Sequence, residues 1–156
     1  MHKDYLFIPH VSVGKFKFGE NINKYTDGID YIYTKAEEEW DWHQYELASP
    51  RISIYVDDDK IVSIACRDKC MLFGSNIIGM TMTDFIALIN AYPDLDQTDT
   101  VYTEDENRRK DKPQIVYEFD NFGIQAWVKN GIIVTAFCSP YESDDESVVP
   151  SRDNKN

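Results

Sequence analysis

The residue types that most often carry catalysis are few in this chain. Its histidines are His2, His10 and His43, and only His43, which lies close to Asp41 and two tryptophans, has neighbours from which a site could be built. A nucleophile or general base needs an orienting partner within hydrogen-bond reach. We therefore interpret the histidines as structural, and we expect a protein without enzymatic activity.

Two acidic motifs resemble reactive or metal-binding sites. Asp94, Asp96 and Thr98 fit the Asp-x-Asp-x-Thr pattern of one class of phosphotransferases, where the motif ends a buried parallel strand. Here the motif follows Pro93 and enters a polar segment, which argues against phosphoryl transfer. The run Asp57–Asp59 lacks the glycine and the later glutamate of a calcium loop. We interpret it as a solvated turn.

The cysteines Cys66, Cys70 and Cys138 cannot all form disulfides within one chain, which favours a reducing compartment. Cys66 and Cys70 have neither a second cysteine pair nor a histidine at ligand spacing. The glycines are scattered and form no phosphate-binding loop. We expect buried thiols, no bound metal and no cofactor.

A formal charge of −12 on 156 residues restricts the class of partner. Such a charge repels nucleic-acid phosphates and anionic membrane surfaces, and it attracts basic proteins at long range. No apolar run approaches the roughly 20 residues of a membrane-spanning helix, and the N-terminus lacks the pattern of a secretory signal. These observations predict a cytoplasmic protein that binds neither nucleic acid nor membrane directly.

The elements that must position any site are organised as two similar units. Residues 52–66 align without a gap with residues 124–138 at an offset of 72, from Ile52 to Ile124. Both segments read as β-hairpins. The second turns at Asn130-Gly131, a dipeptide suited to a type I′ turn, and the first turns at Asp58-Asp59.

A second match, between residues 18–25 and 78–85, predicts a helix at the start of each unit. Thr81 is the expected N-cap of the later helix, with Asp84 at the capping-box position. Its apolar stripe comprises Met82, Phe85, Ile86 and Ile89. Asn21 is the expected cap of the earlier helix, which Asp27-Gly28 should end.

This match has an offset of 60, whereas the hairpins have an offset of 72. The second unit therefore has an insertion of 12 residues between its helix and its hairpin. The charged segment 94–113 is the expected insertion and a mobile loop. Further strands are predicted at 5–8, 11–18, 29–34 and 114–120. The predicted fold is α+β: one domain (1–141), with an antiparallel sheet and two helices on one face, formed by repeats at about 16–67 and 76–139. A flexible acidic tail (142–156) should follow.

The segment 37–46 combines dense negative charge with large aromatic side chains. Trp and Tyr are common binding hot spots, and carboxylates around them would pair with a basic partner. An alternative is an edge strand or short helix whose tryptophans complete the core. The candidate partner-binding residues come from this segment and from two further acidic segments. They are Glu37, Glu38, Glu39, Trp40, Asp41, Trp42, Tyr45, Asp57, Asp58, Asp59, Asp96, Glu104 and Asp105.

The order of helix and strands, repeated, resembles the tandem-repeat fold of the β-lactamase inhibitor proteins. The hairpin phrases ISIYVDDDKIVSIACRDKC and YEFDNFGIQAWVKNGIIVTAFC, with the helix phrase IIGMTMTDFIAL, resemble the immunity proteins of bacterial contact-dependent growth inhibition. These phrases cover about a third of the chain. The resemblance implies a toxin inhibitor that binds a cognate basic toxin domain, often a nuclease, and blocks its active site or substrate cleft; a third protein can join such a complex. The alternatives are a cytoplasmic small-ligand-binding module and an acidic nucleic-acid mimic that inhibits a DNA-binding enzyme.

Overall fold

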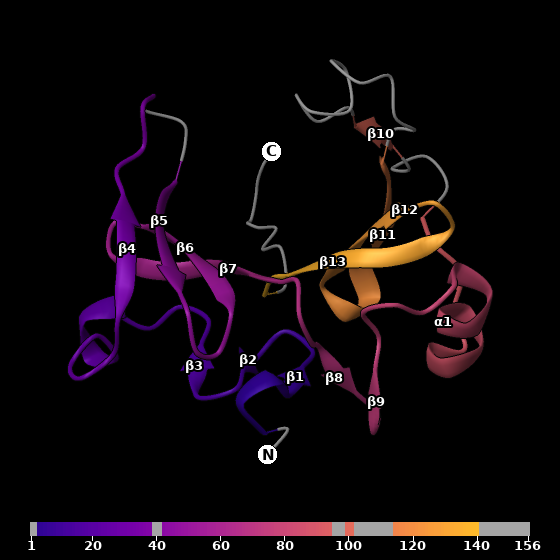
Figure 1. Cartoon of the computed structure of the whole chain (residues 1–156), viewed down its shortest axis with the longest axis horizontal. Coiled ribbons are helices and arrows are strands. Elements are labelled where there is room, and N and C mark those ends of the chain that lie inside the picture. The colour runs from indigo at the N-terminus through magenta and orange to yellow at the C-terminus, as the bar shows by residue number, and fades with distance from the viewer. Residues whose placement is uncertain (1–2, 39–41, 95–98, 102–113, 141–156) are drawn as a thin grey trace, which may run out of the picture.

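The chain forms a long, curved antiparallel sheet with short elements packed along one side of it (Figure 1). A computed structural model describes residues 3–38, 42–94, 99–101 and 114–140. The long sheet has eight strands in the order β10-β11-β12-β13-β7-β6-β5-β4. In chain order these strands are β4 (Tyr31–Thr34), β5 (His43–Leu47), β6 (Ile52–Asp57), β7 (Lys60–Cys66), β10 (Asp99–Val101), β11 (Gln114–Phe119), β12 (Ile124–Lys129) and β13 (Ile132–Cys138).

Both predicted hairpins are confirmed, and their turns have the same backbone geometry. The β6–β7 turn holds Asp58 and Asp59 at φ of 54° and 62°, and the β12–β13 turn holds Asn130 and Gly131 at 54° and 83°. Positive φ at both central residues is the signature of a type I′ turn, whose twist matches that of the flanking strands. Positive φ raises the conformational free energy of Asp58 and Asp59, and an Asn-Gly pair largely avoids this penalty.

The two halves of the long sheet share further features at corresponding positions. The Gly19 amide donates a 2.8 Å hydrogen bond to the Ile61 carbonyl, and the Gly79 amide donates one of 2.7 Å to that of Ile133. Each hairpin has one register shift, at Tyr55/Val56 and at Trp127/Val128. The halves meet where β7 pairs with β13 at the centre of the sheet.

One α-helix lies among the described residues, α1 (Met82–Ile89), and its predicted cap and apolar stripe are confirmed. The Asp84 amide donates a 3.1 Å hydrogen bond to Thr81 Oγ1, and Asn90 ends the helix at a φ of 56°. Phe85 and Ile89 are buried, and the Phe85 ring lies perpendicular to that of Phe119 on β11 at 5.1 Å. This contact holds α1 against the sheet.

The expected first helix is only a three-residue 3-10 turn, η2 (Ile22–Lys24). Asn21 does cap it, because its Oδ1 accepts a 2.8 Å hydrogen bond from the Asn23 amide. The segment that follows reaches Asp27-Gly28 within one turn, so it offers no second helical turn with an apolar stripe. A single turn gains too few hydrogen bonds to offset the cost of nucleating an α-helix.

The N-terminal strands do not join the long sheet as predicted. After a 3-10 turn, η1 (Lys3–Tyr5), they form a separate three-stranded sheet from β1 (Phe7–Ile8), β2 (Ser12–Val13) and β3 (Phe16–Lys17). His10 and Gly14 have φ of 68° and 58° and break the segment into two-residue strands. A Cβ on Gly14 would meet the Asp4 carbonyl oxygen at 2.5 Å, so this close crossing requires glycine.

A short hairpin, β8 (Met71–Leu72) and β9 (Ser75–Asn76), lies beside the N-terminal sheet, and both lie with α1 on one side of the long sheet (Figure 1). The core fills the space between them. Its largest fully buried side chains come from both layers: Phe7, Phe16, Phe85, Ile22, Ile52, Ile54, Ile61, Ile64, Leu72, Ile77 and Ile133. Within the described residues, no helix or strand covers the opposite face of the long sheet. We call this opposite face the open face.

Three residues of the predicted loop at 94–113 belong to a strand instead. Asp99–Val101 forms β10 and pairs with β11. The Asp94 amide donates a 2.8 Å hydrogen bond to the Glu118 carbonyl, and Asp94 Oδ2 accepts one of 2.9 Å from the Asp120 amide. The other loop residues and the predicted tail lie outside the described residues. No helix in the described part of the chain is long and apolar enough to cross a membrane.

Candidate protein-binding face

Four aromatic side chains form a row across the open face. The ring centroids of Trp42 and Tyr55 lie 6.3 Å apart, those of Tyr55 and Phe137 5.9 Å apart, and those of Phe137 and Trp127 5.2 Å apart. We call Trp42, Tyr55, Phe137 and Trp127 the aromatic row. Each distance falls in the range of favourable ring contacts. The rings therefore support one another without a covering layer.

Small residues on the central strand β7 make the row continuous. Tyr55 on β6 lies opposite Ser63, and Phe137 on β13 lies opposite Ala65. Because side chains directly opposite one another share a face of the sheet, the β7 positions between the two rings carry only small groups. The rings of Tyr55 and Phe137 can therefore meet above β7.

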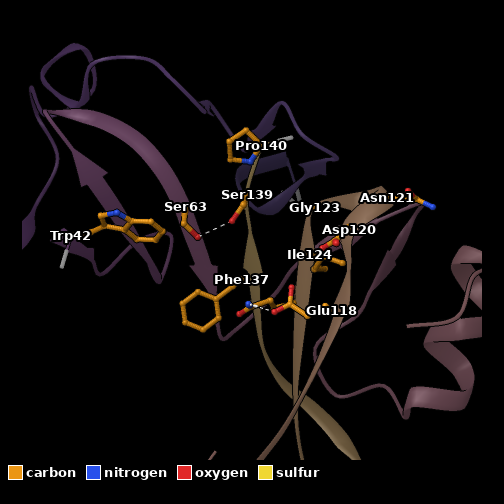
Figure 2. Close-up of a pocket in the computed structure, with 11 residues that line it drawn as sticks. Trp42, Ser63, Glu118, Asp120, Asn121, Gly123, Ile124, Phe137, Ser139 and Pro140 are labelled. Atoms are coloured by element: carbon orange, nitrogen blue, oxygen red, sulfur yellow. Dashed lines mark hydrogen bonds between the residues drawn. The ribbon is translucent and has the colours of Figure 1, made fainter. Parts of the chain in front are cut away.

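Trp42 separates two depressions in the open face. The larger has a volume of about 470 Å³ and lies between Trp42 and Phe137 on one side and Glu118 and Asp120 on the other (Figure 2), and Gln125 also lines it. The second, of about 460 Å³, extends from Trp42 and Tyr55 toward Glu37. Trp42 is 48% exposed although it borders both. A partner side chain can therefore contact this ring from either depression.

Hydrogen bonds orient one carboxylate toward the larger depression. The Trp127 indole Nε1–H donates to Gln125 Oε1 at 3.2 Å, and the Gln125 amide Nε2–H donates to Glu118 Oε2 at 2.6 Å. On the wall of this depression opposite Glu118, Ser63 Oγ donates a 3.2 Å hydrogen bond to the Cys138 carbonyl. The Glu118 carboxylate is thus held in place by a chain of bonds that begins in the aromatic row.

The charge around the larger depression is acidic. Glu118 and Asp120 line it, and its described lining contains no lysine, arginine or histidine. Glu37 borders the second depression together with Lys35, and Glu46 borders a third, smaller one with Arg51 and Arg67. Aromatic rings next to carboxylates form a surface that suits a partner with lysine or arginine side chains.

The structure divides the predicted binding residues between two faces. Glu37 and Trp42 lie at the open face, and Glu38 is exposed in the same connection. Tyr45 lies on the opposite face, where its ring contacts Tyr31 at 5.1 Å and Tyr33 at 5.0 Å, and burial raises the pKa of its phenol. Alternation along β5 separates Tyr45 from Trp42.

The remaining predicted residues fall into two groups. Asp57, Asp58 and Asp59 are exposed at the β6–β7 turn and line none of these depressions. Six residues lie outside the described part of the chain: Glu39, Trp40, Asp41, Asp96, Glu104 and Asp105.

Both described histidines bond to the backbone. His43 Nδ1 accepts a 2.9 Å hydrogen bond from the Ala36 amide, which places the imidazole proton on Nε2 when the ring is neutral. His10 Nε2 lies 2.8 Å from the Asn121 carbonyl oxygen. The first contact ties the β4–β5 connection to β5, and the second ties the β1–β2 turn to the 3-10 turn Asp120–Phe122, in agreement with the structural interpretation of the two side chains.

Sequence reasoning missed the residues of the open face on β11, β12 and β13. The available signal was the alternation in the second hairpin, where Ile124, Ala126 and Val128 are buried while Gln125 and Trp127 are not. Alternation separates two faces, but it does not say which of them other elements will cover.

Comparisons with protein-family models, with curated proteins and with solved structures found no match.

Proposed function

We propose that this chain is a non-enzymatic, cytoplasmic immunity protein that neutralises a cognate toxin domain by binding it on the open face. The aromatic row beside Glu118 and Asp120 carries this proposal. The partner is a basic domain, and a nuclease is the class that best fits a chain of formal charge −12. Covering the toxin's phosphate-binding cleft would block its access to nucleic acid.

The aromatic row would supply most of the binding energy. Buried Trp and Tyr side chains dominate many interfaces, with losses of about 2 kcal/mol or more on truncation. Trp42 is exposed and the other three rings are half-buried, so they can lose further solvent contact without rearrangement. A partner that covers the row would gain this apolar contact.

Glu118 and Asp120 would supply orientation and selectivity. A lysine or arginine that enters the larger depression meets the Glu118 carboxylate, which Gln125 already holds. Because this carboxylate is preorganised, less conformational entropy is lost when the ion pair forms. The charge of the whole chain would raise the association rate with a basic partner.

We further propose that the two halves of the sheet are diverged copies of one unit, as the offsets in the sequence suggest. Their shared turn geometry, register shifts and glycine hydrogen bonds support this origin. Two units joined edge to edge through β7 and β13 would double the width of the sheet. Such a duplication would create a face broad enough for a protein partner.

The proposal is tested by recovering a partner with the tagged chain from its native host. The recovered domain is then expressed alone and together with this chain, and cell survival is measured. We expect the domain to be basic and toxic alone, and harmless when co-expressed. A recovered partner without toxicity, or toxicity that co-expression leaves unchanged, would contradict an immunity function.

Further binding measurements distinguish the immunity function from the two alternative functions. A nucleic-acid mimic would bind several unrelated basic proteins and lose all of them at raised salt. A small-ligand module would instead gain thermal stability from a metabolite that fills the 470 Å³ depression, which is within the usual size of ligand sites. An immunity protein should select one cognate domain over its relatives.

A further inference from the structure

The fold brings all three cysteines of the chain together in the core. Cys66 ends β7 and Cys138 ends β13, and these two strands are neighbours at the centre of the sheet. Cys70 reaches the same point from the connection between β7 and β8. All three sulfur atoms lie within 4.8 Å of one another, and none of the three residues is exposed.

The third cysteine is held in place by its surroundings. The Cys70 amide donates a 3.0 Å hydrogen bond to Asn76 Oδ1, which also accepts one of 3.1 Å from the Ile78 amide. The Cys70 carbonyl accepts a 2.9 Å hydrogen bond from the Ile77 amide. These bonds fix the Cys70 backbone at the place where its sulfur meets the other two.

One sulfur–sulfur distance matches three-coordinate metal ligation, and the other two do not exceed 4.8 Å. With metal–sulfur bonds of about 2.3 Å, a planar trigonal site places its sulfur atoms about 4.0 Å apart (2.3 Å × √3). The Sγ atoms of Cys70 and Cys138 are 4.0 Å apart. We propose that Cys66, Cys70 and Cys138 form a binding site for one soft, thiophilic metal ion of the copper(I) class.

The ligand set decides which ions fit. Soft thiolate ligands favour copper(I) and related ions over hard cations. A structural zinc ion takes four ligands, and no fourth His, Cys, Asp or Glu of the described residues joins this cluster. Metal binding releases the thiol protons to solvent.

The test uses the full-length reduced chain under inert gas, equilibrated with copper(I) that a competing chelator buffers. We expect one copper ion per chain, with three sulfur neighbours at about 2.3 Å by X-ray absorption. Cys70→Ser and Cys138→Ser should each weaken copper binding by more than about tenfold. Ser139→Ala, next to the cluster, should leave it unchanged.

Several results would overturn the site. These are a folded chain that retains no copper, copper with fewer than three sulfur neighbours, or equal retention by the Cys138→Ser variant. A reduced-cytoplasm preparation whose mass shows a Cys70–Cys138 disulfide would also contradict it. Because absorption spectra of the unmodified chain decide the coordination number, the test does not depend on whether the serine variants fold.

Discussion

The rings of Tyr55 and Phe137 lie 5.9 Å apart across β7, although they belong to different hairpins. Ser63 and Ala65 of β7 are small enough to leave the space above the strand to these rings. The contact joins the two halves of the open face into one surface. Binding of a protein partner across the whole open face depends on that continuity.

Trp42→Ala should weaken binding of the cognate partner by about 2 kcal/mol, or roughly 30-fold in Kd. Tyr33→Ala is the matched control, since Tyr33 is 47% exposed where Trp42 is 48% exposed, but lies on the opposite face. Isothermal titration calorimetry measures both. Equal losses from the two variants would mean that the open face is not the interface.

Glu118→Gln should weaken the same complex by about 2 kcal/mol, because a desolvated partner charge loses its counter-charge. The substitution keeps an oxygen that can accept the Gln125 hydrogen bond, so the aromatic row should stay in place. Asp58→Asn removes the same charge at the distant β6–β7 turn and should change Kd little. A salt series on both variants checks the assignment: Glu118→Gln should reduce the salt dependence of binding more than Asp58→Asn does.

The β6–β7 turn should gain stability when it receives the residues of the β12–β13 turn. Replacing Asp58-Asp59 with Asn-Gly should raise the free energy of unfolding by about 1 kcal/mol, because glycine tolerates positive φ. The reciprocal change, Gly131→Asp, should lower it by a similar amount, since Gly131 has a φ of 83°. Urea unfolding measures both changes, and a stability loss in the first would refute the equivalence of the two turns.

Thr81→Ala should destabilise the chain by about 1 kcal/mol, because it removes the oxygen that accepts the Asp84 amide hydrogen bond. Thr83→Ala makes the same chemical change at an exposed helical position and should stay within about 0.5 kcal/mol of the parent chain. Thermal and urea unfolding compare the two. If both variants lose equal stability, α1 is not held by this cap.

Much of the sheet was predictable because local patterns determine it. Alternation predicts the two hairpins, and turn residues such as Asn130-Gly131 set their register. The failures occur where tertiary contacts decide. The N-terminal strands have apolar residues suited to a sheet, yet tight turns at His10 and Gly14 divide them, and the earlier helix is limited by the short distance from Asn21 to Gly28.

The candidate site was only partly predictable for the same reason. Trp42 was identified from local composition, whereas Phe137 and Glu118 become neighbours of Trp42 only when the hairpins pair through β7 and β13. Tyr45 was predicted beside Trp42 because the two are close in the sequence, but strand alternation places them on opposite faces. Likewise, the spacing of Cys66 and Cys70 does not indicate that Cys138 will join them.

Survival of cells that express the recovered toxic partner tests the central claim most directly. Two double variants carry the same types of change on different surfaces: Trp42→Ala with Glu118→Gln on the open face, and Tyr33→Ala with Asp58→Asn away from it. The account predicts that the first variant, folded and expressed at the same level, fails to protect the cells, while the second protects them fully. Protection by the first, or its loss in the second, would contradict binding through the open face.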